Sequence, residues 1–429
     1  MSAPDSAALD LAVTALGAAG DGLARLPDGA ACFVPRGLPG ERLAVRVLGK
    51  RGAGVLAEPE AVLRASAERV EPPCPHFALC GGCALQHWAD APYVEWKRAK
   101  LVEALSRAGF AGAPVGPLFR TPPRARRRAD FALRRRPDGG VSLGFHARLG
   151  GAVLDLHACE VLDPRLVALF DPLRDLLRGL PALRREGSAV LNLLDTGPDL
   201  LLRTDGALDA PARTRLAAFA AAHGIPRIAW ALGSGAPEIA AQHGPAAIRF
   251  GEAVVNPPPG AFLQASPAGE AAIRDAVLRG LPERLSARAA VAELHAGIGT
   301  LSFALAGSAR VVAYEVSVEA VEALAAAAGR AGARVKVVRR DLARQPLMPA
   351  ELKPFAAIVL DPPFGGAPEQ VPLLARARVP RVVYVSCNPA ALARDAGTLK
   401  EAGYRVLSAA PVDQFLWSPH LESVVVFSL

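Results

Sequence analysis

Long apolar runs, aromatic residues and cysteines are all scarce in this chain of 429 residues. No run of about 18 uninterrupted apolar residues is present, which argues against a transmembrane helix. The start, Met1 to Asp5, has neither the positive charge nor the apolar core of a secretory signal peptide. Aromatic residues make up 5% of the sequence, so recognition by many stacked rings is not indicated. We therefore expect a cytoplasmic protein that has no membrane partner.

Disulfides are improbable for the six cysteines in a reducing cytoplasm, so metal binding or catalysis is the better explanation for them. Cys32 lies in the apolar run Ala31–Val34 and is expected to be a small core residue. Four others are candidates for one thiolate site: Cys74, Cys80, Cys83 and Cys159. Four thiolates can hold zinc or an iron–sulfur cluster. Three clustered cysteines plus a remote one favour the cluster without deciding between the two.

Hydrophobic residues make up 51% of the sequence, which indicates globular domains, and a chain this long is expected to form two or three of them. The net charge of +8 permits a polyanionic partner. Residues 8–58 combine short apolar alternations with glycine-rich turns, a pattern typical of an oligonucleotide-binding barrel and equally of other small β-domains. A helix is expected at residues 90–109, and residues 115–250 mix strands and helices.

After residue 285 the sequence alternates buried strands with alanine-rich helices, which predicts a parallel α/β sheet. The expected strands are 291–294, 310–315, 335–338, 357–361 and 381–386, and the expected helices include 317–331 and 389–402. A last strand, 423–428, must fit the same sheet and is expected at or near an edge.

The first of these strands runs into a glycine turn, and the next three are each followed by or end in an acid: Glu315, Asp341 and Asp361. Gly297 and Gly299 allow a tight turn and close approach of a ligand to backbone at a helix N-terminus. Such a site suits either a nicotinamide dinucleotide or S-adenosylmethionine. Ser302 stands where a third dinucleotide-binding glycine would fall, and Asp361 is followed by two prolines, so S-adenosylmethionine is favoured.

Cys387 and Glu422 are the residues that indicate a reaction. Cys387 lies in Tyr384–Pro389, where a strand ends and a helix begins. A thiolate that adds to C6 of uracil makes C5 nucleophilic enough to take a methyl group, and a carboxylate can then remove the C5 proton. We expect the helix N-terminus to lower the pKa of Cys387. A lone cysteine at a strand end is ordinarily a packed core thiol, but a Ser-Cys-Asn-Pro turn beside a cofactor site favours catalysis.

Eight arginines fall between residues 120 and 136, with Asp130 as the one acid in that segment. They are Arg120, Arg124, Arg126, Arg127, Arg128, Arg134, Arg135 and Arg136. A solvated face enriched in arginine by GC-rich coding is the plain alternative. The density of positive charge favours a surface that contacts phosphates.

Together these motifs resemble the RNA 5-methyluridine methyltransferase family, in its iron–sulfur branch that modifies 23S rRNA. Cys74–Phe77 and Cys80–His87 are similar to that family's cluster motif, and Gly20–Gly22 with Val34–Glu41 look like its N-terminal TRAM barrel. The resemblance covers nearly the whole chain. It implies a multidomain α/β protein with an OB-like TRAM β-barrel in residues 1–60, a central mixed α+β RNA-binding domain with the four-cysteine site in 61–250, and a Rossmann-like class I methyltransferase domain in 251–429.

The resemblance also implies roles for particular residues. Cys387 falls on the nucleophile, Glu422 on the base and Asp361 in the reaction pocket. Positions that contact S-adenosylmethionine in the family fall on Gln264, His295, Thr300, Glu315, Asp341 and Asp361. The cysteines fall on the ligands of a [4Fe-4S] cluster: Cys74, Cys80, Cys83 and Cys159. The implied substrate is 23S rRNA, protein-free or assembling, and the implied enzyme is a monomer.

Three positions depart from the family pattern. Phe364 follows the two prolines where arginine is usual, so the family's substrate contacts at that loop are not carried over. Ala296 and Ser266 replace a common cysteine and a usual asparagine. Two alternative functions stay open, methylation of tRNA and a non-catalytic RNA-binding or iron–sulfur assembly role, although the latter would need neither Cys387 nor Glu422.

Overall fold

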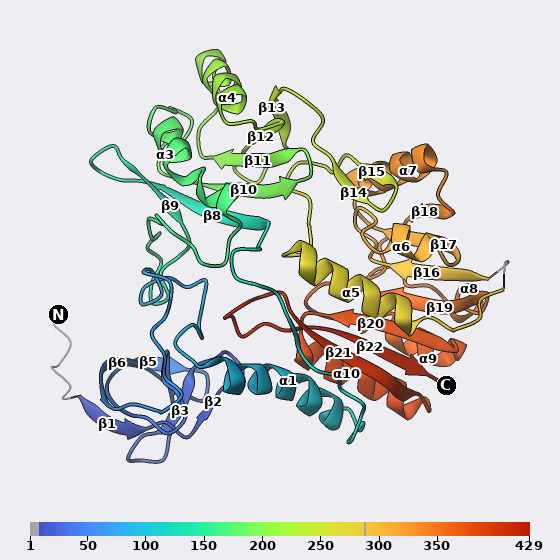
Figure 1. Ribbon diagram of the computed structural model, residues 1–429, viewed down its shortest axis with the longest axis horizontal. Coiled ribbons are helices and arrows are strands. Elements are labelled where there is room, and N and C mark those ends of the chain that lie inside the picture. Colours follow the sequence, from blue (N-terminus) through green and yellow to red (C-terminus); the bar gives the residue numbers. More distant parts are fainter. Residues whose placement is uncertain (1–7, 287–288) are drawn as a thin grey trace.

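A computed structural model describes residues 8–286 and 289–429 of the chain. These residues form three main sheets in separate parts of the molecule, with helices packed on the second and third (Figure 1). Within the described ranges, no helix is both long and apolar enough to cross a membrane.

The first sheet is built from residues 9–64 and has six strands in the order β1-β5-β6-β4-β3-β2. Its strands are β1 (Leu9–Ala12), β2 (Ala15–Leu16), β3 (Gly22–Arg25), β4 (Ala31–Val34), β5 (Arg42–Arg51) and β6 (Gly54–Arg64). Buried and exposed residues alternate along several of these strands, so one face encloses a small core that includes Leu11, Val34 and Leu43. Cys32 is fully buried in that core, as predicted.

The cysteine-rich segment, residues 65–89, consists of turns and isolated bridges and leads into the predicted helix, α1 (Asp90–Arg107). The buried face of α1 includes Leu101 and Leu105 and packs against α10 (Pro389–Glu401), almost 300 positions later in the chain. The cysteine-rich segment therefore lies between the first sheet and helix α1, which is packed on the third sheet (Figure 1).

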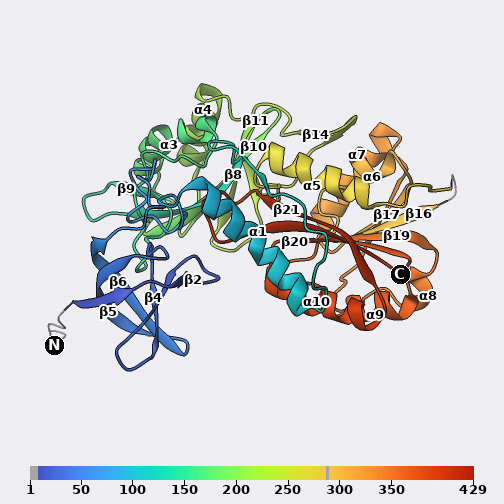
Figure 2. The same ribbon diagram turned by 60° about the horizontal axis from the view of Figure 1, so that its bottom comes forward.

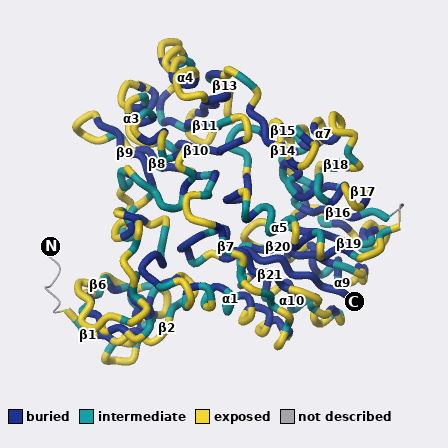
Figure 3. Tube along the Cα trace, viewed as in Figure 1, coloured by how far each residue is buried: buried dark blue, intermediate teal, exposed yellow. Residues whose placement is uncertain are grey.

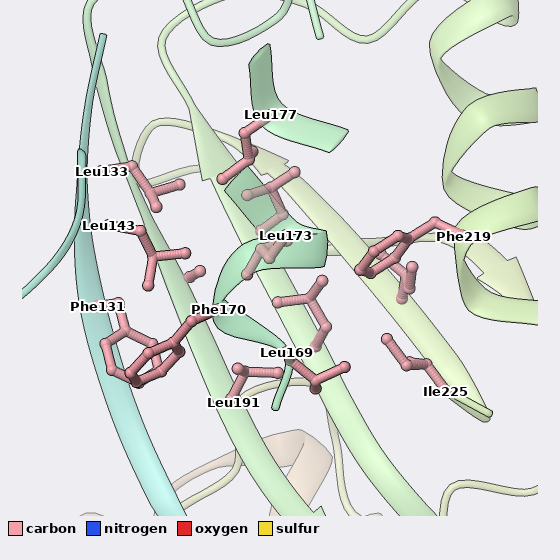
Figure 4. Packing of buried hydrophobic residues seen from close by; sticks show 14 of the residues in the cluster. Phe131, Leu133, Leu143, Leu169, Phe170, Leu173, Leu177, Leu191, Phe219 and Ile225 are labelled. Carbon is pink, nitrogen blue, oxygen red and sulfur yellow. The ribbon is translucent and has the colours of Figure 1, made fainter. Parts of the chain in front are cut away.

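The second sheet has six strands in the order β13-β12-β11-β10-β8-β9. They are β8 (Arg128–Arg135), β9 (Val141–Gly144), β10 (Glu186–Leu194), β11 (Gly197–Thr204), β12 (Arg227–Leu232) and β13 (Glu238–Gln242), with α2 (Pro164–Val167), α3 (Phe170–Arg178) and α4 (Ala210–Ala222) as the helices of this region. Figure 4 shows the core between this sheet and α3, where the rings of Phe131 and Phe170 meet edge to face with centroids 5.3 Å apart.

The third sheet has eight strands in the order β18-β17-β16-β19-β20-β22-β21-β7. They are β7 (Phe119–Arg120), β16 (Ala290–Leu294), β17 (Arg310–Glu315), β18 (Val335–Arg339), β19 (Phe355–Leu360), β20 (Arg381–Ser386), β21 (Arg405–Asp413) and β22 (Glu422–Ser428). The strands β18 to β20 in this order are parallel, as the alternation of strands and helices predicted. The last strand of the chain, β22, is not at the edge, because the unpredicted strand β21 and then β7 lie beyond it.

Helices cover both faces of the third sheet (Figure 2). Besides α10 they are α5 (Pro267–Gly280), α6 (Ser302–Ala306), α7 (Val318–Ala331), α8 (Pro349–Leu352) and α9 (Val371–Ala377). Successive side chains of a strand point to opposite faces, so Val359 and Val383 pack towards α5 and α6, while Ile358 and Tyr384 pack towards α1, α9 and α10. The central strands are consequently the most continuously buried part of the chain (Figure 3).

A small hairpin connects the second and third sheets along the chain. Its strands, β14 (Ile248–Phe250) and β15 (Ala253–Val255), pair only with each other and pack on α7. The segment that follows, residues 256–266, leads into α5 and carries Gln264 to the edge where the parallel strands end.

Candidate active site

The predicted catalytic residues meet at one edge of the third sheet. Asp361 directly follows β19, and Cys387 directly follows β20. Because β22 runs antiparallel to β20, its first residue, Glu422, lies at this same edge, where Ser386 pairs with Ser423. Ligands of open α/β sheets bind in the crevice beyond the carboxyl ends of the strands.

The turn after β16 is open beside Gly297. That residue has a φ of 55°, and no heavy atom lies within 4 Å of the position its Cβ would take. Its N–H donates to Glu315 Oε2 at 2.8 Å, so the turn and the end of β17 are fixed together. Gly299 has a different role, because a Cβ there would lie 2.3 Å from the side chain of Leu324 in α7. Gly297 leaves space for a ligand, whereas Gly299 allows packing.

Further acids gather around this turn. Burial lowers the pKa of His295, whereas the charges of Glu315 and Asp341 act in the opposite direction. Burial raises the pKa of Glu293 to about 8, and Ser302 donates a hydrogen bond to that carboxyl group. Glu293 was not singled out in the sequence, although it lies in a strand whose other residues are apolar. A turn surrounded by acids suits a cationic ligand better than an anionic pyrophosphate.

Thr300 lies at the end of the same turn but has other neighbours. It lines a cavity of about 320 Å³ together with Phe250, Glu270 and Phe303. Its contact with a cofactor therefore stays a prediction that rests on resemblance alone.

Two glutamines connect Asp361 to Glu422. Gln264 Nε2 donates to Asp361 Oδ2 at 3.4 Å. Gln414 Nε2 donates to Gln264 Oε1 at 2.7 Å and to Glu422 Oε2 at 2.9 Å, and its own Oε1 accepts from Ala265 N at 2.9 Å. The other oxygen of Glu422, Oε1, is buried and has no hydrogen-bond partner among the described residues. That oxygen is free to take a proton.

Sequence reasoning missed Gln414, because β21 was not recognised as a strand. The available signal was a polar pair, Asp413-Gln414, directly after the apolar residues 409–412. The same strand end supplies the buried ion pair between Asp413 and Lys97 of α1, at 2.8 Å. Both residues are fully buried, so the pair holds α1 to the catalytic edge.

Burial raises the pKa values of the ionisable groups at this edge, and neighbouring carboxylates raise those of Glu422 and Cys387 as well. Burial and the nearby Asp361 charge raise the pKa of Glu422 to about 8, and burial also raises that of Asp361. Burial, Glu422 and Asp361 together raise the pKa of Cys387 to about 11. The prediction that the N-terminus of α10 would lower it is wrong, because burial and two neighbouring acids outweigh the helix dipole.

The loop after Asp361 is tied to the turn that holds Cys387. Asn388 caps α10 through its side-chain oxygen and donates from Nδ2 to the Phe364 carbonyl at 2.9 Å. Arg394 donates to the Gly365 carbonyl at 2.8 Å. The Phe364 ring is 58% exposed and stands edge-on to His420, with centroids 6.4 Å apart. Phe364 thus presents an aromatic ring beside the turn that holds Cys387.

The four predicted cysteine ligands line one cavity of about 130 Å³. Burial, together with the charges of the other three thiols, raises the pKa of Cys83 to about 12. A single zinc ion needs donors about 2.3 Å from one point. Within residues 8–286 and 289–429, no group of three or more His, Cys, Asp or Glu side chains is arranged to hold one metal ion.

The eight predicted RNA-binding arginines do not share one surface. Arg127 is buried, donates to the Gln264 carbonyl at 3.1 Å and forms an ion pair with Glu270. Arg135 donates to carbonyls at the C-terminus of α3, including that of Leu177 at 2.9 Å. These two arginines hold parts of the protein together, and their role as phosphate ligands stays a prediction.

The remaining six are at least partly accessible. Arg126 and Arg128 are half-buried, with their guanidinium groups 5.9 Å from the ring centroids of Phe415 and Phe262 respectively. The others form ion pairs at the surface, Arg120 with Asp90, Arg124 with Glu160, Arg134 with Glu186 and Arg136 with Asp138. Exposed ion pairs contribute little to stability, so these arginines can exchange an acid for a phosphate at low cost.

Comparison with known proteins gives consistent matches. Residues 282–429 match the family tRNA (Uracil-5-)-methyltransferase. A Caulobacter vibrioides protein named as an uncharacterized RNA methyltransferase is 40% identical over 98% of this chain and 99% of its own. The 23S rRNA (uracil(1939)-C(5))-methyltransferase RlmD of Chromohalobacter salexigens is 36% identical over 99% of this chain and 90% of its own.

Among solved structures, the tRNA (uracil-54, C5)-methyltransferase of Pyrococcus abyssi, in complex with S-adenosyl-L-homocysteine, is similar with a TM-score of 0.74. The match covers 97% of this chain and 99% of that chain at 21% sequence identity. At that identity the likeness establishes the fold, in which the third sheet has the class I methyltransferase arrangement.

Proposed function

Since this chain belongs to the tRNA (uracil-5-)-methyltransferase family, whose members are S-adenosylmethionine-dependent RNA methyltransferases, we propose that it methylates C5 of a uridine in 23S rRNA. The observation that carries the reaction is the meeting of Cys387, Glu422 and Asp361 at one edge of the sheet, with one oxygen of Glu422 unpartnered. The substrate class rests on the 36% identical relative named for 23S rRNA.

Cys387 acts as the nucleophile. Its sulfur forms a bond to C6 of uracil, and the electrons of the C5–C6 double bond move onto the C4 carbonyl as an enolate. The thiol proton must leave first, to Asp361 or to solvent, because Glu422 must stay deprotonated to take the C5 proton later. S-adenosylmethionine, when bound, supplies the methyl group that C5 then attacks.

Glu422 completes the reaction as the base. It takes the proton from C5, the C5–C6 double bond re-forms, and the Cys387 sulfur leaves C6. Gln414 orients this carboxylate by its hydrogen bond to Oε2, which leaves Oε1 facing the proton. Asp361, hydrogen-bonded to Gln264, helps to shape the pocket.

The residues around the glycine turn fit S-adenosylmethionine. The space beside Gly297 admits a ligand, Glu315 lies where a strand-end acid can contact a ribose, and Gln264 lies between the turn and the base. His295, Gly299, Thr300 and Asp341 complete the proposed set. The acidic surroundings favour the sulfonium cation.

We assign the cysteine cavity to a [4Fe-4S] cluster held by Cys74, Cys80, Cys83 and Cys159. A cluster distributes its four thiolate ligands over several iron atoms, so it does not need them to meet at a single point. The reaction includes no oxidation or reduction, and the cluster is proposed to be structural.

We further propose the domains that the resemblance implied: a TRAM-like OB barrel (1–60), a central RNA-binding domain with the cysteine site (61–250) and the methyltransferase domain (251–429). RNA phosphates would contact the accessible arginines, among them Arg124, Arg134 and Arg136. The enzyme is proposed to act as a monomer.

The test is covalent trapping on 5-fluorouridine-substituted 23S rRNA fragments with S-adenosylmethionine. Fluorine at C5 cannot leave as a proton, so the adduct should persist and mass spectrometry should place it on Cys387. An adduct formed with tRNA alone would keep the chemistry and replace the substrate, as the name of the matching family allows. No adduct with either RNA would overturn the proposal.

A further inference from the structure

The loop of residues 414–421 connects two sites that the proposed reaction does not link. It starts with Gln414 at the end of β21 and leads to Glu422 at the start of β22. Its middle residues, Leu416 and Ser418, line the cavity of the four cysteines. One loop of eight residues therefore contacts both the cysteine site and the base.

Backbone hydrogen bonds fix the loop to the cysteine segment. The Trp417 carbonyl accepts from Ala84 N at 2.8 Å and from Leu85 N at 3.0 Å, directly after Cys83. Arg126, which lines the same cavity, lies over the ring of Phe415. A shift of the cysteine segment would therefore displace the middle of the loop.

The other side of the loop is held by α1. Tyr93 OH accepts from Trp417 N at 2.9 Å and donates to Asp413. Lys97 donates to Asp413 and to the His420 carbonyl. Lys100 donates to the preceding carbonyl of the loop, that of Pro419, at 2.7 Å.

Trp417 needs these contacts to keep its conformation. Its φ is 57°, a left-handed value that is rare for a bulky residue, and it is 8% exposed. Such a conformation is strained and persists only where the surroundings impose it. Without its anchors the loop is expected to relax.

We propose that the four-cysteine site positions Glu422: by holding the 414–421 loop through Trp417, it sets where Gln414 and Glu422 meet. Trp417 is a positioning residue in this arrangement. The role of Glu422 as base rests on the proposed function, whereas the mechanical coupling rests on the contacts alone. The group at the cysteines needs no change of oxidation state to act in this way.

The test is amide hydrogen exchange on the full-length, anaerobically purified protein, with iron content measured in parallel. Cys159→Ser removes one thiol that is distant in sequence from the segment that contacts Trp417. We expect exchange of residues 414–421 to accelerate about tenfold or more, while β16 and β17 stay protected. Cys32→Ala, a buried cysteine of the first sheet, is the matched control and should leave the loop protected.

A second variant loosens the loop from the other side. Tyr93→Phe removes only the hydroxyl between Trp417 and Asp413, so it should accelerate loop exchange with the iron content unchanged. Both variants should also shift the acid limb of the pH–rate profile and lower kcat. The KM for S-adenosylmethionine should stay unchanged. Loss of iron from Cys159→Ser without faster exchange of the loop would overturn the coupling. Because exchange needs no RNA, it decides the coupling even if no RNA is methylated.

Discussion

Gln414 donates a hydrogen bond to Glu422 Oε2 at 2.9 Å, and the same amide nitrogen donates to Gln264 Oε1 at 2.7 Å. A side-chain amide has two N–H groups, so Gln414 uses both to join the proposed base to a residue of the proposed cofactor site. This relationship gives Glu422 one fixed oxygen and one free oxygen.

Gln414→Leu is expected to shift the pH dependence of methylation. The hydrogen bond from Gln414 lowers the pKa of Glu422, so its loss should raise that pKa above the present value of about 8. A base works only when deprotonated, so the acid limb of the kcat profile should move to higher pH, with the largest loss near pH 7.

The matched control for this variant is Gln370→Leu. Gln370 is also buried, and its side chain pairs with both backbone groups of Leu347, away from the reaction. It should lower the melting temperature and leave the acid limb in place. Equal shifts for the two variants would contradict a specific role for Gln414.

Cys387→Ala should abolish methylation by about a thousandfold or more, because no other described side chain at this edge is a comparable nucleophile. Binding of S-adenosylmethionine, measured by calorimetry, should change little. Since the pKa of Cys387 is raised to about 11, the wild-type rate of adduct formation should increase with pH from 7 to 9. A rate that is flat over this interval would show that deprotonation of the thiol does not limit attack.

Glu422→Gln should separate methyl transfer from proton removal. The glutamine keeps the size of the side chain but cannot accept the C5 proton, so the methylated, Cys387-linked RNA should accumulate. Denaturing gels of enzyme with unmodified RNA would reveal it as a slow-moving band that wild-type protein lacks. Free 5-methyluridine at the wild-type rate would assign the base to another residue.

The sequence predicted the third sheet well and the contacts between its parts poorly. Strands such as β19 and β20 are continuous apolar runs that end in Asp361 and Cys387, so both their type and their functional ends were visible. β21 escaped because Ser408 and Pro411 interrupt its apolar run, and a proline inside such a run argues against a strand. Because β21 was missed, Gln414 at its end was missed too. The connection that Gln414 makes between Gln264 and Glu422, which are 158 positions apart, could therefore not be predicted.

The density of charged residues predicted the function of a segment less well than the pattern of apolar residues predicted the strands. A sequence shows that eight arginines are close along the chain, but not that Arg127 faces Glu270 or that Arg135 faces the last carbonyls of a helix. Similarly, the sequence around Cys387 predicted a helix dipole that would lower the pKa of the thiol. The charges of Glu422 and Asp361, which raise that pKa, come from other strands. Long-range partners of polar groups decide their roles, and local sequence does not contain them.

Arg127 and Arg134 should respond differently to substitution. Arg127→Met leaves Glu270 without its partner in a mostly buried site and should destabilise the protein by about 3 to 5 kcal/mol, measured by urea unfolding. Arg134→Ala should leave stability nearly unchanged, because its side chain is 48% exposed. It should instead weaken RNA binding and reduce the salt dependence of that binding by about one unit of slope. An unchanged slope would remove Arg134 from the RNA surface.

Phe364 offers a test of how this chain departs from its family. Its exposed ring lies beside the nucleophile turn, held there by the hydrogen bond from Asn388, so it is placed to stack on a base next to the target uridine. Stacking on an aromatic ring is worth about 1 to 3 kcal/mol per base, so Phe364→Ala should raise KM for RNA by about 5- to 150-fold. Phe364→Trp should retain the wild-type KM, and Phe364→Arg should retain part of it, because a guanidinium plane also stacks on bases. If alanine, tryptophan and arginine variants all bind RNA as the wild type does, the ring serves only to pack against His420.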